Sequence, residues 1–420
     1  MTNVSSFGTW NELERKINPA PFMKMLRDSA PVYFDPDYKG YLVTRHSDFH
    51  EVIKDPMTFS NAKALYGEYR YQDIVEAILA REGHGSMAKI LPMADPPEHT
   101  RVRAITNALL NNRRVQSILP FVEGLANELV DGFIADGHAD MVSRFSSPLP
   151  VTTIGELLCL PKERWRDIIK WQVAFSACVG NYLESAEQAE KYGRDIAEMQ
   201  NFLVGVLDER REVRGDDVLS DLLFNNPTDY EPLTQAEILG IATALIGGGH
   251  ESTTTAITNL VHTLATSPHI VTALREAPNR KRAIAQFVEE LLRMRPPVAA
   301  IPRIVTQDTH IGGVAIPAGA KVILAHCSVN RDEALFSERP EEFDLDRRNA
   351  ARHVTFGSGI HVCMGAMIAR AEIQTAATVL LERLDNMRLA EPGVSLSDYK
   401  LSIFDWNYVL QRLDVTFDAR

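Results

Sequence analysis

Residues 356–365 read Phe-Gly-Ser-Gly-Ile-His-Val-Cys-Met-Gly, and a helix-prone stretch from Ala366 to Leu380 follows them. Three glycines around one cysteine predict a tight loop, because glycine adopts backbone conformations that other residues avoid. A thiolate at Cys363 would be stabilised by the N–H groups of the loop and by the start of the following helix. The segment therefore predicts a reactive or metal-binding cysteine, although a small buried cysteine beside a turn would also fit it.

Motif spacing excludes several other kinds of site. His250-Glu251 lacks the second histidine of a zinc H-E-x-x-H site, and the chain has no C-x-x-C pair. Gly365 is not followed by the Lys and Ser/Thr of a phosphate-binding loop, and no G-x-S-x-G elbow occurs. For Cys363 this leaves covalent nucleophilic catalysis or a single axial bond to a cofactor metal.

Composition and charge limit the class of protein. The 420 residues suit one large domain or two smaller ones, and 45% apolar with 24% charged residues is typical of a soluble globular protein. A net charge of −12 argues against a nucleic acid or an anionic membrane as partner. The four cysteines are too scattered for a disulfide framework, which favours a reducing compartment. For Cys159, Cys178 and Cys327 we expect ordinary buried packing roles. Without a signal pattern or an apolar run of about 20 residues, the sequence predicts a cytoplasmic protein with no membrane anchor.

The central part of the sequence predicts one long helix. Thr234-Gln-Ala-Glu237 is a capping box, and Pro268 is the next strong stop, so a helix of about 30 residues fits between them. Gly247, Gly248 and Gly249 lie in its middle, and each costs about 0.8–1 kcal/mol relative to alanine. Either close helix packing or a flat ligand against the backbone would explain three consecutive glycines.

Helical periodicity dominates the rest of the chain, with few β segments. A second helix is predicted over 279–293, where apolar residues recur with the period of one buried stripe. We therefore expect a mainly α protein with a helical body over 95–295 and a small β lobe formed by roughly 30–60 and 300–326. Short strands are predicted at 41–44, 303–305, 310–316 and 321–325, divided by Gly312-Gly313 and by Pro317-Ala-Gly319.

Several motifs together resemble those of the cytochrome P450 family. Phe356-Gly-x-Gly-x-His-x-Cys363-x-Gly365-x-x-x-Ala369-Arg370 is similar to its complete haem-binding signature. The matches keep the family's order and cover roughly residues 20–415. The other matching segments are Asp95–Arg103, similar to the helix that crosses a haem edge, Gly248–Ser252, similar to the oxygen-activation motif, Glu290–Arg293, similar to E-x-x-R, and Phe343–Arg347, similar to the meander.

The resemblance implies one domain over residues 1–420, a mostly α triangular prism that holds haem b between the long central helix and the Cys loop at 356–365. Cys363 would be the proximal thiolate ligand of the iron, with Phe356 packed beside its sulfur, and Gly248 would let the haem approach the central helix. Glu290, Arg293 and Arg347 would form a structural ion-pair network. The candidates for binding the haem propionates are His99, Arg103, Arg303 and His361.

On the distal side of the haem, an acid followed by an alcohol would relay protons to dioxygen. That pair is Glu251 and Ser252, whereas the family usually has threonine at the second position. Thr253 ranks second, because one residue along a helix turns its side chain by about 100°. For Thr254, Thr255 and Thr258 we expect hydroxyls that bond back to helix carbonyls.

The same resemblance implies a haem-dependent monooxygenase that hydroxylates or epoxidises an apolar or amphipathic small molecule. Electrons would come from NAD(P)H through a separate ferredoxin and its reductase. No acid occurs within 99–122 or 347–371, so an arginine-rich face would attract an acidic ferredoxin. The predicted docking residues are Arg101, Arg113, Arg114 and Arg352.

Two other functions remain open from the sequence. One is a haem-thiolate peroxygenase, dehydratase or isomerase that needs no external electrons, which Ser252 leaves possible. The other is a non-catalytic haem-based binder or sensor, against which the acid–alcohol pair argues. By family topology, the substrate would contact residues 60–93, 171–182, 244–248, 298–301 and 403–406.

Overall fold

The computed structural model describes residues 7–62, 64, 71–87, 90–179, 183–401 and 408–420. The chain divides into two compact units, each made of separate stretches of sequence. Unit 1 comprises residues 1–59, 120–149 and 252–420, and unit 2 comprises residues 60–119 and 150–251. That the whole chain forms a single domain therefore remains a prediction.

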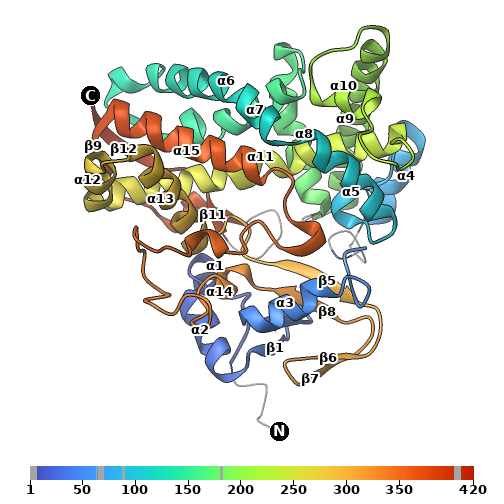
Figure 1. Cartoon of the computed structure of the whole chain (residues 1–420), viewed down its shortest axis with the longest axis horizontal. Coiled ribbons are helices and arrows are strands. Elements are labelled where there is room, and N and C mark those ends of the chain that lie inside the picture. The colour runs from blue at the N-terminus through green and yellow to red at the C-terminus, as the bar shows by residue number, and fades with distance from the viewer. Residues whose placement is uncertain (1–6, 63, 65–70, 88–89, 180–182, 402–407) are drawn as a thin grey trace. The chain divides into compact units, whose positions relative to one another are not determined.

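Unit 1 contains a five-stranded sheet in the order β1-β2-β8-β5-β3 (Figure 1). Strand β2 pairs in parallel with β8, with Gly40 opposite Lys321, and the other neighbours whose register is known, β1–β2 and β5–β8, are antiparallel. The strands lie in the two sequence regions where the β lobe is predicted. Their bounds are β1 Val32–Asp35, β2 Gly40–Val43, β3 Phe59–Ser60, β5 Ile301–Val305 and β8 Lys321–Leu324.

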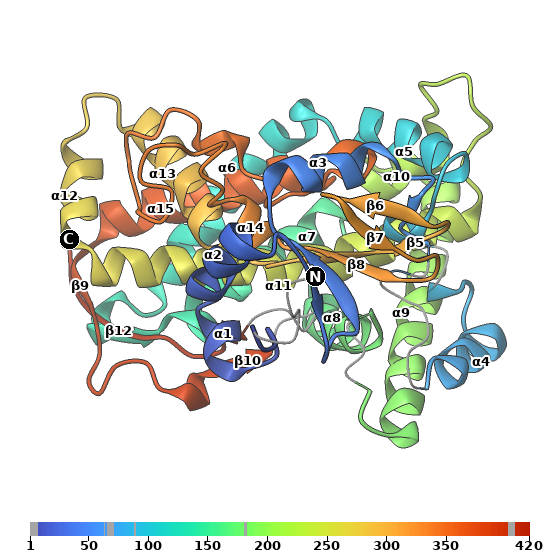
Figure 2. The ribbon, with the colours of Figure 1, turned by 90° about the horizontal axis from the view of Figure 1, so that it is seen from below.

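Alternating side chains of this sheet are buried on both faces, as the two-residue period of a strand requires. Val322 and Leu324 pack with Phe49 of helix α3, while Ile323 packs on the opposite face with Met23 of helix α2. Helices α2 and α14 lie side by side (Figure 2). The helices near this sheet are α1 Leu13–Ile17, α2 Ala20–Ser29, α3 His46–Lys54 and α14 His326–Val329.

The remaining helices of unit 1 include α13, which carries the predicted apolar stripe. Its buried residues include Ile284, Phe287 and Leu291, and it packs against α15 (Figure 2). The side chain of Asn279 caps the helix by accepting a hydrogen bond from the backbone N–H of Arg282. These helices are α12 Pro268–Glu276, α13 Arg280–Met294 and α15 Ala366–Arg383.

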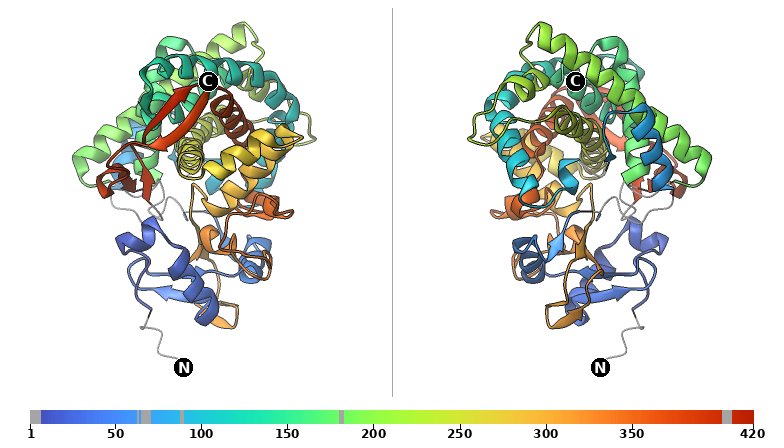
Figure 3. Two further views of the ribbon diagram at one scale, coloured as in Figure 1. Left: turned by 90° about the vertical axis from the view of Figure 1, so that its left-hand side faces the viewer. Right: turned by 90° about the vertical axis from the view of Figure 1, so that its right-hand side faces the viewer.

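Three smaller sheets complete the described part of unit 1. A three-stranded sheet in the order β4-β12-β9 lies at the C-terminus (Figure 3), and two-stranded sheets pair β6 with β7 and β10 with β11. Gly312 and Gly313 form the β6–β7 turn with φ of +54° and +81°, so these glycines divide the segment 310–316 as predicted. The strands are β4 His138–Asp140, β6 Thr309–Ile311, β7 Val314–Ile316, β9 Leu384–Leu389, β10 Tyr399–Leu401, β11 Tyr408–Leu410 and β12 Asp414–Ala419.

Unit 2 is helical in its described residues, apart from the last residue of β3. Helix α9 packs against both α4 and α8, and Gly193 of α9 lies against Ile78 of α4, where an added Cβ would be 3.0 Å from Ile78 Cδ1. Close packing of these helices therefore depends on a small residue. The helices of unit 2 are α4 Gln72–Glu82, α5 Glu98–Leu109, α8 Trp165–Val179, α9 Ala186–Glu212 and α10 Val218–Phe224.

Three helices run through the sequence boundaries of the units: α6 Asn112–Asp131, α7 Pro148–Leu157 and α11 Gln235–Thr266. The 32-residue α11 confirms the predicted central helix. Its capping box is formed, since Thr234 Oγ1 accepts from the N–H of Glu237 at 3.3 Å and Glu237 Oε2 accepts from the N–H of Thr234 at 2.8 Å. Among the described residues, no helix combines the length and the apolar character needed to cross a membrane.

Candidate active site

The loop of residues 356–365 in unit 1 presents Cys363 at the beginning of α15. The backbone N–H of Cys363 donates to the carbonyl of Phe356 at 2.8 Å, which closes the loop, and the cysteine side chain is exposed. Gly357 and Gly359 have φ of +72° and +67°, and a Cβ at Gly359 would lie 2.6 Å from Ile53 Cγ2. The glycines are therefore needed both for backbone conformation and for close packing.

The other cysteines are not in comparable positions. None of the four cysteines is in a disulfide bond, and burial raises the pKa of both Cys178 and Cys327 to about 12. Buried packing roles are therefore confirmed for these two. For Cys159 that prediction is wrong, because this residue is exposed just after the end of α7.

Glu290, Arg293 and Arg347 form the predicted ion-pair network in unit 1. Arg293 Nε and Nη2 donate to the two carboxylate oxygens of Glu290 at 2.7 and 2.8 Å, and Arg347 Nε donates to Glu290 Oε1 at 3.1 Å. All three residues are buried. The remaining guanidinium N–H groups donate to backbone carbonyls between Asn330 and Glu342, so the network fixes the segment that precedes the Cys loop.

A second network, which the sequence does not predict, starts at the neighbouring Glu289. Arg370 Nε donates to Glu289 Oε1 at 2.6 Å, and His353 Nε2 lies 3.2 Å from Glu289 Oε2. Burial opposes ionisation of Glu289, but its bonds with His353 and Arg370 lower its pKa to about 2. The Arg370 guanidinium lies 4.4 Å from the ring centroid of Phe356, so this network supports the Cys loop directly.

Arg303 and His361 of unit 1 line one small cavity of about 10 Å³, together with Ile53 and Phe59. Arg303 is buried, and its Nη1 donates to the carbonyl of Pro302 at 2.7 Å. A guanidinium and an imidazole that converge at a cavity form a donor set suited to a carboxylate.

The other two candidate propionate residues, His99 and Arg103, lie one turn apart on α5 in unit 2. His99 is buried, and burial followed by the nearby Arg103 guanidinium lowers its pKa to about 4. At neutral pH His99 is therefore an uncharged hydrogen-bonding group, and Arg103 is the cation of the pair.

The three consecutive glycines of α11 differ in their surroundings within unit 2. An added Cβ at Gly247 would lie 2.2 Å from Phe175 Cδ1, and one at Gly249 would lie 2.9 Å from Ile154 Cδ1. At Gly248 an added Cβ would meet no atom within 4 Å, and this residue is exposed. Close packing thus explains Gly247 and Gly249, and only Gly248 leaves the helix surface open for a flat group.

Glu251 is held in unit 2 by a residue that the sequence does not single out. Gln172 of α8 donates from Nε2 to Glu251 Oε2 at 3.1 Å. The signal in the sequence is weak: one amide beside Trp171 in an otherwise apolar helical stripe. Ser252 is half-buried and Thr253 is buried. Because the Ser252 side chain is the more accessible of the two, Ser252 stays the first candidate for the alcohol of the predicted acid–alcohol pair.

The prediction that neighbouring threonines bond back to helix carbonyls is wrong for Thr254 and Thr258. Their hydroxyl oxygens are buried without a hydrogen-bond partner among the described residues. Farther along α11, Thr263 and Thr266 do make such bonds, at 2.7 Å each. The two unbonded hydroxyls therefore carry the desolvation cost of unsatisfied buried polar groups.

The predicted arginine-rich docking set is partly neutralised. In unit 2, Arg101 pairs with Glu237, and Arg114 pairs with Asp221 at 2.6 Å and with Asp216 at 3.3 Å. The expectation that these two arginines present free charge is therefore wrong, because acids distant in sequence reach them. Arg113, Arg348 and Arg352 are exposed.

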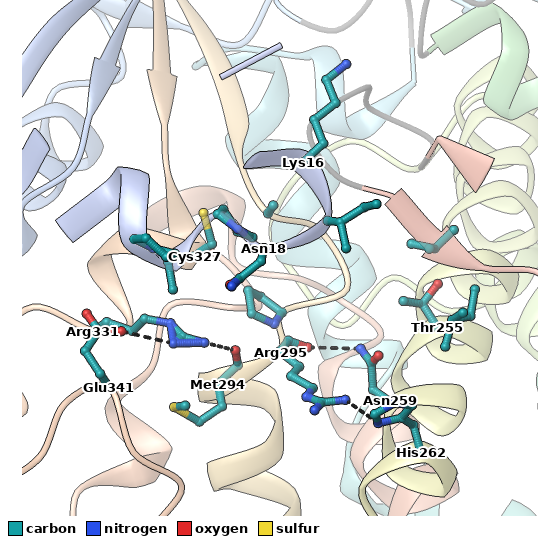
Figure 4. Close-up of a pocket in the computed structure, with 18 of the residues that line it drawn as sticks. Lys16, Asn18, Thr255, Asn259, His262, Met294, Arg295, Cys327, Arg331 and Glu341 are labelled. Carbon is teal, nitrogen blue, oxygen red and sulfur yellow. Dashed lines mark hydrogen bonds and ion pairs between the residues drawn. The ribbon is translucent and has the colours of Figure 1, made fainter. Parts of the chain in front are cut away.

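A larger cavity of about 730 Å³ lies in unit 1 (Figure 4). Asn259 and His262 of α11 line it with Arg295, whose Nη1 lies 2.9 Å from His262 Nδ1. Burial followed by Arg295 lowers the pKa of His262 to about 4, so the imidazole accepts this hydrogen bond in its neutral form. None of the predicted catalytic or cofactor-binding residues is among the described residues that line this cavity.

The predicted substrate segments are only partly described. Residues 403–406 lie outside the described residues, as do 63, 65–70, 88–89 and 180–182 within the longer segments. The segment 244–248 lies on α11 and includes the exposed Gly248, while Ala299 and Ala300 of the segment 298–301 are buried.

Comparison with known proteins gives concordant matches. The family model for cytochrome P450 matches residues 43–391. The chain is 34% identical over 377 residues to mycinamicin IV hydroxylase/epoxidase of Micromonospora griseorubida, covering 88% of this chain and 89% of that protein. It is 31% identical over 375 residues to linalool 8-monooxygenase of Pseudomonas putida, covering 88% and 90%. The solved structure of cytochrome P450 CYP109Q5 from Chondromyces apiculatus matches with a TM-score of 0.82 and 28% identity, covering 98% of both chains.

Proposed function

The chain belongs to the cytochrome P450 family, and from this premise we propose that it hydroxylates or epoxidises an apolar or amphipathic small molecule with electrons from a separate ferredoxin. It is a haem-dependent monooxygenase, and redox partners supply its electrons from NAD(P)H. One relative is named a linalool 8-monooxygenase and another a mycinamicin IV hydroxylase/epoxidase, which supports the proposed reaction type.

The observation that carries the proposal is the position of Cys363. Its exposed side chain stands at the start of α15 on a loop closed by its own N–H, so its sulfur can serve as the single thiolate ligand of haem iron. When bound, haem supplies the redox chemistry that activates dioxygen for insertion of one oxygen atom. Arg303 and His361 would bind a propionate from their shared cavity, as would His99 and Arg103 from α5.

The remaining roles fall to α11. Gly248 would allow the flat face of haem against the helix, because an added Cβ at this exposed residue would meet no atom within 4 Å. Glu251 would take up and release protons at its carboxylate, and the Ser252 hydroxyl would pass them toward the reacting oxygen. Serine lacks the γ-methyl that restricts the rotamer of threonine, so we expect looser coupling of proton delivery to hydroxylation. Thr253 is the second candidate for this step.

For the electron donor we propose an acidic ferredoxin that docks near the exposed Arg348 and Arg352 of unit 1. Arg352 ends the short helix η7, Ala350–Arg352, four residues before the Cys loop begins. Arg113 of unit 2 is a further exposed cation. Exposed charges of this kind raise association rates at low salt.

The experiment that tests the haem assignment is the spectrum of the reduced, carbon-monoxide-bound protein. A thiolate ligand shifts the Soret band far to the red, and we expect Cys363→Ala to abolish the shift. Cys159→Ala is the matched control, since Cys159 is also an exposed cysteine. Persistence of the shifted band in Cys363→Ala would refute the assignment.

Turnover experiments then separate the functional classes. We expect NADPH-driven turnover with a surrogate ferredoxin and reductase, and a screen of apolar compounds for low-to-high-spin shifts would identify the substrate. Turnover with peroxide alone, and none with the reductase system, would instead favour a peroxygenase.

A further inference from the structure

The side chain of Gln172 lies at the centre of a buried polar cluster in unit 2. Gln172 belongs to α8, whose neighbouring positions Ile168, Trp171 and Phe175 are buried apolar residues. Gln172 as a whole is only 4% exposed. A buried amide is unfavourable unless its donors and acceptor are all used, so its place in this stripe calls for a function.

The contacts of Gln172 use both ends of its amide. Nε2 donates to Glu251 Oε2 at 3.1 Å and to Ser176 Oγ at 2.5 Å, while Oε1 lies 3.2 Å from His250 Nδ1. Ser176 and His250 are buried as well. The amide therefore joins α8 to two consecutive residues of α11.

The chemistry of the carboxylate determines the direction of these bonds. An ionised Glu251 can only accept, so the Gln172 NH₂ group must face it. The Gln172 carbonyl then faces His250, which must carry its proton on Nδ1 in order to donate. Turning the amide over would place its oxygen against the carboxylate oxygen, so this orientation is the one that suits an ionised Glu251.

Packing brings the two helices close enough for this contact. Phe175 lies one turn after Gln172 on α8 and covers Gly247 of α11, where a Cβ would be only 2.2 Å from the ring. Because glycine at this position allows the close approach, Gln172 can reach residues 250 and 251 about one turn farther along α11.

We propose that Gln172 is a positioning residue for proton delivery, holding the Glu251 carboxylate in place through an uncharged donor. The inference rests on the role of Glu251 given under the proposed function. An amide anchors a carboxylate less strongly than a cation would, because a charged donor strengthens the hydrogen bond. The Gln172 amide therefore orients the Glu251 carboxylate without placing a positive charge beside it.

The test uses the holoenzyme with a surrogate ferredoxin, its reductase and NADPH, without added substrate. The readouts are the rate of NADPH oxidation, the fraction of electrons that ends in hydrogen peroxide, and the change of both in D₂O. The variants are Gln172→Met, Glu251→Gln and the double variant. Lys170→Met is the matched control, because Lys170 lies on the same helix and pairs with the exposed Glu198.

We expect Gln172→Met to lower the oxidation rate about two- to tenfold, the factor that corresponds to one hydrogen bond, and to change the solvent isotope effect. In the Glu251→Gln background, the same substitution should add nothing, because Gln172 acts through Glu251. Lys170→Met should behave like the wild type. If Gln172→Met fails to bind haem, Gln172→Asn replaces it, since the shorter amide cannot reach the carboxylate.

An equal loss from Gln172→Met in both backgrounds would show a merely structural role and overturn the inference. An effect of Glu251→Gln with none of Gln172→Met would also overturn it, while leaving the role of Glu251 intact. No effect of Glu251→Gln would reject the relay and the inference with it. The carbon-monoxide spectrum of the same samples tests the haem assignment independently.

Discussion

Replacing each of the three consecutive glycines of α11 by alanine, one at a time, should change the free energy of unfolding in different directions and so distinguish their roles. Alanine at the middle of a helix is favoured over glycine by about 0.8–1 kcal/mol when the methyl group has room. Gly248 has room, since no atom lies within 4 Å of an added Cβ. We therefore expect Gly248→Ala to stabilise the haem-free protein by about 1 kcal/mol.

The other two positions should respond differently. At Gly247 the methyl would lie 2.2 Å from the ring of Phe175, which is only 5% exposed and has to move as a whole. Overpacking of this kind costs about 1–3 kcal/mol, so Gly247→Ala should be destabilising by up to about 2 kcal/mol after the helix gain. At Gly249 the contact is the terminal methyl of Ile154 at 2.9 Å, which can rotate aside, and we expect little net change.

Urea unfolding of the haem-free variants measures the order of their stabilities. Haem retention in the holoproteins measures how far each added methyl group weakens haem binding. We expect Gly248→Ala to be the most stable without haem and to lose haem fastest with it. Phe175→Leu in the Gly247→Ala background should restore stability. Equal stability of Gly247→Ala and Gly248→Ala would refute the packing argument, and undiminished haem retention in Gly248→Ala would refute the role of its open surface.

Three further predictions concern unit 1. Glu290→Gln leaves two buried guanidiniums without their carboxylate and should cost about 3–5 kcal/mol in urea unfolding, and a loss under 1 kcal/mol would contradict the network's structural role. Burial opposes ionisation of Glu289, but His353 and Arg370 lower its pKa from 4.5 to about 2. The contribution of Glu289 to stability is therefore complete above about pH 4.5 and is lost as the pH falls toward 2. Glu289→Gln should flatten that part of the acid-unfolding curve. An unchanged curve would exclude this contribution of Glu289. Arg352→Glu should slow reduction by ferredoxin several-fold at low salt and little at high salt, as stopped-flow kinetics would show, and a salt-independent rate would argue against docking there.

Local signals in the sequence predicted the elements that carry the site. The capping box at Thr234 and the stop at Pro268 located α11, and the E-x-x-R spacing identified a pair that lies on one face of α13. Such features depend on neighbours within a few residues. The glycines of the Cys loop were predicted for the same reason, because a positive φ is a local requirement.

Partners that are distant in sequence could not be predicted in the same way. Segment 99–122 has no acid of its own, yet Arg101 and Arg114 pair with Glu237 and Asp221, more than 100 residues away. A local count of charges says nothing about neutralisation by another helix. Gln172 was missed for the same reason, since only the packing of α8 on α11 shows that its amide meets Glu251.

The parallel pairing of β2 with β8 has a consequence for synthesis of the chain on the ribosome. Gly40 pairs with Lys321, so β2 waits for a partner that is made 281 residues later. At about 5–20 residues per second, the delay is roughly 15–60 s. During that time the hairpin of β1 and β2 has an open edge that other nascent chains can pair with. Strand β2 is only four residues long, from Gly40 to Val43, which limits the risk of such wrong pairing. Lengthening this strand would increase losses to aggregation during expression.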